Sequence, residues 1–91
     1  MPVNHKANDK LYELYDFCMI NGFKTYRSND NMMSNYSSTV HAVKGAVWIW
    51  ADSSLNKFML ITSTGATETC SLTDLQLKDG SLIINDKEFM V

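Results

Sequence analysis

Two histidines and two cysteines are the side chains best suited to covalent or acid–base chemistry in this 91-residue sequence. His41 could act as a base toward the thiol of Cys18 or Cys70, because a thiol becomes a strong nucleophile when a base lies within hydrogen-bond reach. The spacing does not place these groups together. Cys18 falls on an apolar helical stripe and Cys70 in a predicted strand, where thiols are usually inert. We therefore favour a protein without enzymatic activity and keep a small enzyme that uses His41 as the alternative.

A metal or cofactor site would need several ligands close together in the chain. His5 and His41 join the two cysteines as nominal metal ligands, but no two of the four lie within five residues of each other. Structural zinc sites usually contain ligand pairs at such short spacing. The glycines are also too far apart to form a phosphate-binding loop. We expect neither a metal nor a cofactor.

Aromatic and methionine side chains offer a site of a different kind, one for binding. Some of them lie in two consecutive strand-like segments, and the others in the Asn- and Ser-rich segment before these strands. Tryptophan, tyrosine and methionine are enriched at the centres of protein interfaces. The predicted partner-binding residues are Trp48, Trp50, Met59, Met32, Met33 and Tyr36.

Basic residues near the same rings suggest a nucleic-acid interface as the alternative. Bases stack on exposed aromatic rings while lysine and arginine side chains contact the phosphates. The residues of this alternative are Tyr26, Lys24, Arg27, Lys44 and Lys57. A net charge of −2 and a single arginine disfavour a protein whose affinity comes from phosphate contacts. Nucleic-acid binding therefore ranks second.

The segment before residue 23 has the pattern of an amphipathic helix. Apolar residues recur at helical spacing on one stripe, namely Leu11, Leu14, Tyr15, Cys18 and Met19. Asn8 or Asp9 can cap the start of this helix. Asn21 and Gly22 can end it, because glycine readily adopts a left-handed conformation after the last turn. The pattern predicts a helix over residues 9–20.

The rest of the chain alternates between strand-like segments and short polar or glycine-containing turns, the pattern of an antiparallel meander. The predicted strands are 23–27, 39–44, 46–51, 57–62, 68–72, 75–78, 81–84 and 87–91. Residues 28–38 are predicted as a long loop, and Asp79-Gly80 as a tight hairpin turn. The sequence thus predicts a single α+β domain over residues 1–91. One N-terminal helix packs on an antiparallel sheet of five to six strands, with closure into a small barrel as an option.

Two of the predicted strands are apolar on both faces. All four side chains of residues 47–50 are apolar, so Trp48 and Trp50 form a second apolar face, and residues 58–61 repeat this pattern. A single helix can cover only one of these faces. The other face needs a closed barrel, the 28–38 segment or a protein partner to cover it.

Composition and the polar N-terminal residues suggest where such a protein acts. Asn, Ser and Thr make up 24 of the 91 residues, and this composition resembles that of small accessory proteins of AT-rich phage genomes. The resemblance implies an inhibitor or adaptor that binds a larger host protein, and a homodimer stays open. Residues 1–10 contain no apolar run of a secretory signal, and the longest apolar run, 46–51, is too short to cross a membrane. We expect a cytoplasmic protein without membrane contact.

Overall fold

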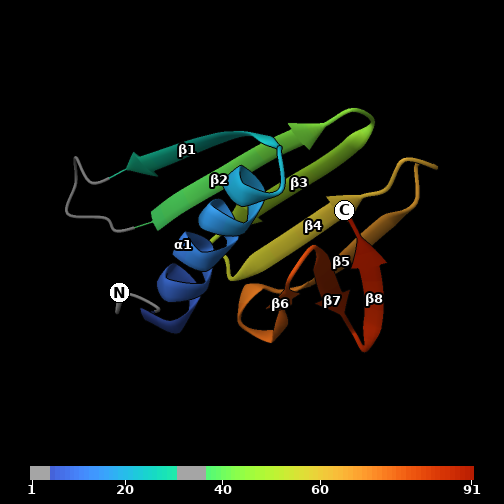
Figure 1. Ribbon diagram of the computed structural model, residues 1–91. Helices are drawn as coiled ribbons and strands as arrows, with labels where there is room; N and C mark the ends of the chain where they lie inside the picture. The colour runs from blue at the N-terminus through green and yellow to red at the C-terminus, as the bar shows by residue number, and fades with distance from the viewer. Residues whose placement is uncertain (1–4, 31–36) are drawn as a thin grey trace.

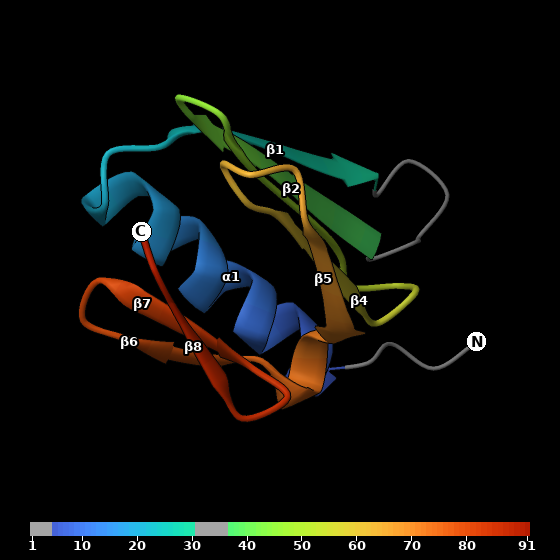
Figure 2. The same cartoon turned by 90° about the vertical axis from the view of Figure 1, so that its right-hand side faces the viewer.

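The computed structural model describes residues 5–30 and 37–91, and this part of the chain forms one helix, α1 (His5–Ile20), between two antiparallel β-sheets. Figure 1 shows the larger sheet behind the helix, and Figure 2 shows the smaller sheet on the opposite side of the helix. The predicted α+β class is therefore confirmed, as is the antiparallel meander that follows the helix.

The larger sheet has five strands in the order of the chain, and every neighbouring pair is antiparallel. Its strands are β1 (Lys24–Asp30), β2 (Ser37–Lys44), β3 (Val47–Asp52), β4 (Lys57–Ile61) and β5 (Thr67–Ser71). Because β1 and β5 are the two edges of this sheet and do not pair with each other, the sheet is open and no barrel forms.

The smaller sheet begins after a short 3-10 helix, η1 (Leu72–Asp74), which turns the chain away from β5. Its three strands are β6 (Gln76–Lys78), β7 (Ser81–Ile84) and β8 (Lys87–Met90). Leu72 and Leu75 are fully buried on either side of the turn, and the N–H of Leu75 donates to the carbonyl oxygen of Leu72 at 3.2 Å. Burial of these leucines directs the next strands to the far side of α1. The predicted sheet of five to six strands is thus two sheets, of five and three.

The predicted loop over residues 28–38 is partly strand. Strand β1 continues to Asp30 and β2 begins at Ser37, where the two strands pair. Asparagine and serine disfavour strands on their own, but pairing with a neighbouring strand overrides this preference. The rest of the loop, residues 31–36, lies outside the described residues.

The buried side of helix α1 is rotated from the predicted stripe, because sheets pack on two sides of the helix. Its buried residues are Ala7, Leu11, Leu14, Phe17 and Cys18. The predicted stripe is wrong at Met19, which is 53% exposed, and Tyr15 is only half-buried. The buried side of the helix includes Phe17 instead, and a helical pattern that assumes one covered side does not predict this burial.

The two ends of α1 differ in how well the sequence predicts them. The helix starts at His5, so Asn8 and Asp9 lie inside it and the predicted cap is wrong. Ala7 is completely buried, and its packing extends the helix by a turn. The predicted end is confirmed. The N–H of Gly22 donates to the carbonyl of Met19 at 3.3 Å, and the N–H of Phe23 donates to the carbonyl of Cys18 at 2.9 Å. These two hydrogen bonds form the Schellman pattern of a helix end.

Replacement of Gly22 tests this helix end. Its φ of +83° lies in the left-handed region, and an added Cβ would meet nothing within 4 Å, so any penalty comes from the backbone alone. We expect Gly22→Ala to lower the free energy of unfolding by about 1 kcal/mol. Gly22→Asn should lose less, because asparagine tolerates this conformation better. Urea unfolding of the two variants measures the difference. Equal stability of Gly22→Ala and the parent would contradict the assigned helix end.

Candidate functional site

The larger sheet has one covered side and one open side. We call the side that packs on α1 the inner face and the opposite side the outer face. The inner face carries Val40, Ala42, Ile49, Ala51, Phe58 and Leu60, none more than 1% exposed. Side chains alternate along a strand, so the residues between these point outward. The apolar and aromatic residues of the outer face are Tyr26, His41, Val43, Trp48, Trp50, Met59 and Ile61.

One row of outward side chains crosses four strands. Tyr26 lies opposite His41, and His41 lies opposite Trp50 in the next strand. Trp50 is in turn opposite Met59. Directly opposed side chains in antiparallel strands are neighbours that pack against each other. The row is therefore a continuous band of aromatic, imidazole and thioether groups.

A second row runs beside the first and connects to it through ring contacts. Trp48 lies between Val43 and Ile61 in this row. The His41 ring is 5.4 Å from the Trp48 ring and 6.2 Å from the Tyr26 ring between centroids, with tilts of 30° and 33°. These distances lie in the favourable range for aromatic pairs. The rings are thus held in place by one another and by the sheet.

The outer face is accessible in the described structure. Tyr26 is 57% exposed and Trp48 is 46% exposed, while Trp50 and Met59 are half-buried by their neighbours. A solvated face of an antiparallel sheet ordinarily carries polar side chains. Exposed apolar groups gathered on one surface are typical of interaction sites.

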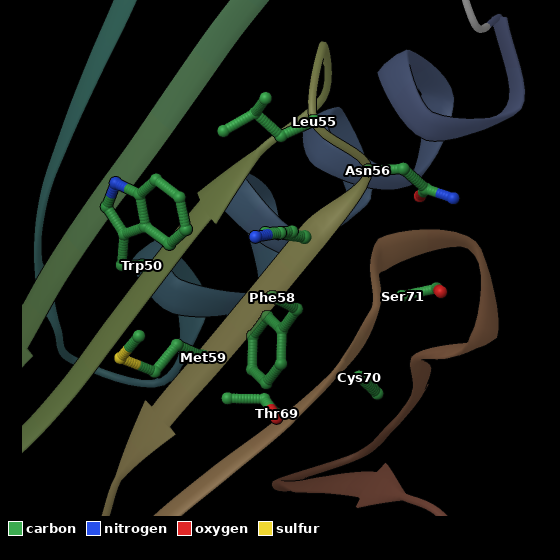
Figure 3. A pocket seen from close by; sticks show the side chains of 9 residues that line it. Trp50, Leu55, Asn56, Phe58, Met59, Thr69, Cys70 and Ser71 are labelled. Atoms are coloured by element: carbon green, nitrogen blue, oxygen red, sulfur yellow. The ribbon is translucent and has the colours of Figure 1, made fainter.

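A hollow of about 480 Å³ lies at one end of the outer face (Figure 3). Residues of β3, β4, β5 and the β3–β4 turn line it, among them Trp50, Leu55, Lys57, Met59, Thr69 and Ser71. Figure 3 shows the Trp50, Leu55 and Met59 side chains around the hollow, with Thr69 on the β5 side. Its volume is within the range of small-ligand sites, so it can hold one or two side chains of a partner.

Hydrogen bonds fix the turn that forms one wall of this hollow. Oδ1 of Asp52 accepts from the backbone N–H of Ser54 at 2.8 Å and from that of Leu55 at 3.2 Å. The N–H of Thr73 donates to Oδ1 of Asn56 at 3.1 Å, and Nδ2 of Asn56 donates to the Thr73 hydroxyl at 3.2 Å. The turn is thereby tied to η1, and Leu55 is held outward at 57% exposure.

Two basic residues of the predicted nucleic-acid site point away from the outer face. The Arg27 guanidinium lies 4.2 Å from the centre of the Tyr12 ring, on the α1 side of the sheet. Nζ of Lys44 donates to the carbonyl oxygen of Asn21 at 2.9 Å, also on that side. The rings of the outer face therefore have fewer cations beside them than the sequence spacing suggests.

The other predicted site residues divide into two groups. The structure brings together on the outer face Trp48, Trp50, Met59, Tyr26, Lys24 and Lys57. The residues that lie outside the described part of the chain are Met32, Met33 and Tyr36. Sequence reasoning did not assign Val43, Ile61 and Leu55 to this surface. The strand alternation that places the tryptophans outward could have found the first two, while Leu55 depends on the geometry of the turn.

The histidine and the two cysteines do not form a reactive pair. His41 is on the outer face, whereas Cys18 is buried in α1 and Cys70 is paired with Phe58 on the inner face. Burial raises the pKa of the Cys18 thiol to about 12. Burial, and secondarily the Asp74 carboxylate, raises the pKa of Cys70. Both shifts favour the unreactive thiol over the nucleophilic thiolate.

The described residues contain no group of three or more His, Cys, Asp or Glu side chains placed to hold a metal ion. No helix in that part of the chain is long and apolar enough to cross a membrane. Comparison with known protein families, curated proteins and solved structures found no match to this chain. A functional proposal therefore depends on the outer face itself.

Proposed function

We propose that this chain is a non-enzymatic protein-binding module whose contact surface is the outer face of the larger sheet. The observation that carries the proposal is the band of exposed aromatic and apolar side chains on that face, opposite the face that α1 covers. Burial of such groups against a partner releases water and stabilises a complex in proportion to the apolar area covered. An inhibitor or adaptor of a larger protein in the cytoplasm fits this surface.

The arrangement of the rings supports binding with little conformational cost. Tyr26 and Trp48 each contact His41 on a paired strand, so these side chains lose few rotamers when a partner arrives. Preorganised aromatic anchors of this kind commonly supply most of the energy of an interface. The outer face therefore has the makeup of an interface centre.

The outer face is of limited extent. Five strands about 4.8 Å apart, paired over about five residues of 3.4 Å, give a projected footprint on the order of 400 Å². We propose that a larger protein covers the face and also contacts the loops around it.

Charge ranks nucleic-acid binding below protein binding. Lys24 and Lys57 are the basic residues of the predicted set that remain on the outer face, and Asp52 also faces outward. Single-strand binders need a groove of cations that follows the phosphates. A local charge of about +1 does not provide that groove.

A double substitution tests the proposal. We expect Trp48→Ala with Trp50→Ala to reduce capture of a protein partner from a host lysate about 30-fold, the effect of losing a hot spot worth about 2 kcal/mol. The fold should persist, because Trp48 is 46% exposed and Trp50 only half-buried. Quantitative mass spectrometry of captured proteins measures the first effect, and far-UV circular dichroism during heating checks the second.

The matched control removes exposed apolar groups elsewhere. Ile20→Ala with Met90→Ala changes side chains that are 83% and 75% exposed away from the outer face, and capture should be unchanged. Equal capture by the parent and the tryptophan variant would contradict the proposal. Micromolar binding of a labelled single-stranded oligonucleotide that weakens steeply with salt would favour nucleic-acid binding instead.

A further inference from the structure

We infer that the hollow beside Trp50 receives an acidic, apolar peptide segment of the protein partner, with one apolar side chain inserted and a neighbouring carboxylate on Lys57. This inference rests on the proposed function and specifies the chemistry of the partner. Its basis is the combination of an apolar hollow with a cation that forms no ion pair within 4 Å in the described structure.

The walls of the hollow fit an apolar side chain. Trp50 and Met59 supply an aromatic and a thioether surface from adjacent strands, and Leu55 closes the side formed by the β3–β4 turn. The volume of about 480 Å³ accommodates a leucine, phenylalanine or tryptophan side chain together with part of its backbone. Thr69 and Ser71 line the β5 side with hydroxyl groups, which can donate hydrogen bonds to peptide carbonyls or to a carboxylate.

Lys57 lines the hollow, and the Asp52 carboxylate lies opposite it in the strand register. Among the residues that line the hollow, Lys57 alone is charged. Its outward neighbour across the strands, Asp52, uses Oδ1 to accept three hydrogen bonds within its own turn. Among the described residues no carboxylate lies within 4 Å of the Lys57 ammonium, and the ion pair found there is Lys10 with Glu13 on α1. The Lys57 ammonium can pair with a carboxylate brought by a ligand.

The other carboxylates of the described chain mostly lie on other surfaces. Three belong to α1, and four others lie in η1 and the smaller sheet with its turns. The outer face around the hollow therefore repels an acidic segment less than the chain's net charge of −2 suggests. One carboxylate suffices to neutralise Lys57, whereas a nucleic acid brings a phosphate with every nucleotide and finds one cation at this site.

A peptide selection tests the inference with defined probes. A displayed library of random heptapeptides is selected on the parent protein, and we expect enrichment of Leu, Phe or Trp next to Asp or Glu. A fluorescein-labelled synthetic peptide of the enriched sequence is then titrated by fluorescence polarisation. We expect Lys57→Glu to weaken its binding at least tenfold and Leu55→Ala to weaken it severalfold. Lys57→Glu should also shift a repeated selection toward peptides with Lys or Arg beside the apolar residue.

Lys78→Glu is the matched control, because it makes the same charge change on an exposed residue of the smaller sheet. The inference is overturned by equal losses in the Lys57 and Lys78 variants, by enrichment of basic peptides on the parent, or by no enrichment at all. Tighter binding of a labelled oligothymidine than of the acidic peptide, lost in Lys57→Glu, overturns it in favour of a nucleic acid. If the two tryptophan substitutions abolish partner capture while Lys57→Glu leaves capture intact, the proposed function stands and this inference alone fails.

Discussion

Deletion of residues 79–91 is expected to abolish cooperative unfolding, because it removes β7 and β8 from the side of α1 opposite the larger sheet (Figure 2). Leu82 and Ile84 in β7 are completely buried. Truncation of one such side chain costs about 2–5 kcal/mol, against a total stability of about 5–15 kcal/mol for a domain. Loss of both, together with exposure of one side of α1, should exceed what the remaining sheet can offset.

Thermal unfolding followed by circular dichroism and calorimetry measures this loss. Two point variants in the same sheet provide the control. Ile84→Ala should lower the free energy of unfolding by about 2–5 kcal/mol. Met90→Ala, at a residue 75% exposed, should change it by no more than about 0.5 kcal/mol. A shortened chain that still melts cooperatively at the parent temperature would mean that α1 and the larger sheet fold without the smaller one.

The elements of this fold could be predicted from the sequence because each has a local cause. Alternating apolar residues, separated by glycine or by short polar turns, predict strands close to where β2 to β8 are observed. The C-terminal end of α1 depends on Gly22, whose positive φ is a property of that residue and its neighbours. Such local signals do not depend on which strands pair with one another.

The division into two sheets could not be predicted because it depends on packing between distant residues. No local sequence signal shows that β5 and β6 belong to different sheets. Burial of Leu72 and Leu75 nevertheless turns the chain between these two strands. The same long-range packing buries Phe17 and leaves Met19 exposed, because the position of the second sheet determines which side of α1 is covered. A helical stripe read from the sequence assumes one covered side.

The candidate site was predictable in its residue types and less so in its geometry. Strand alternation alone places Trp48 and Trp50 on one face. The contact of His41 with Trp48 requires the register between β2 and β3, which depends on the whole hairpin. The contact of Arg27 with Tyr12 likewise joins the sheet to α1, so its direction away from the outer rings is a tertiary feature.

Alkaline pH is expected to destabilise the protein through Cys18. The folded chain holds the pKa of this thiol at about 12, against 9.0 for an exposed thiol, because burial disfavours the thiolate. Between these values the unfolded chain loses the proton and the folded chain keeps it. The contribution of the protonated Cys18 thiol to the free energy of unfolding is therefore fully present below pH 9, and it declines as the pH rises toward 12. Each pH unit in this window removes up to about 1.4 kcal/mol, so about 2–3 kcal/mol should be lost between pH 9 and pH 11.

Comparison with Cys18→Ala isolates this effect from the titration of lysines and tyrosines, which both proteins share. Urea unfolding at a series of pH values from 8 to 11 gives the free energy of unfolding for each protein. The alanine variant should be less stable than the parent at pH 8, because it leaves a small cavity in the core. Its stability should then fall more slowly with pH, so that the gap narrows by about 2–3 kcal/mol at pH 11. The difference in stability between the parent and a Cys70→Ala variant should change less with pH, since Cys70 is only half-buried. A gap that stays constant from pH 8 to pH 11 would mean that the folded protein lets Cys18 ionise as readily as the unfolded chain, which is incompatible with its complete burial between α1 and the sheets.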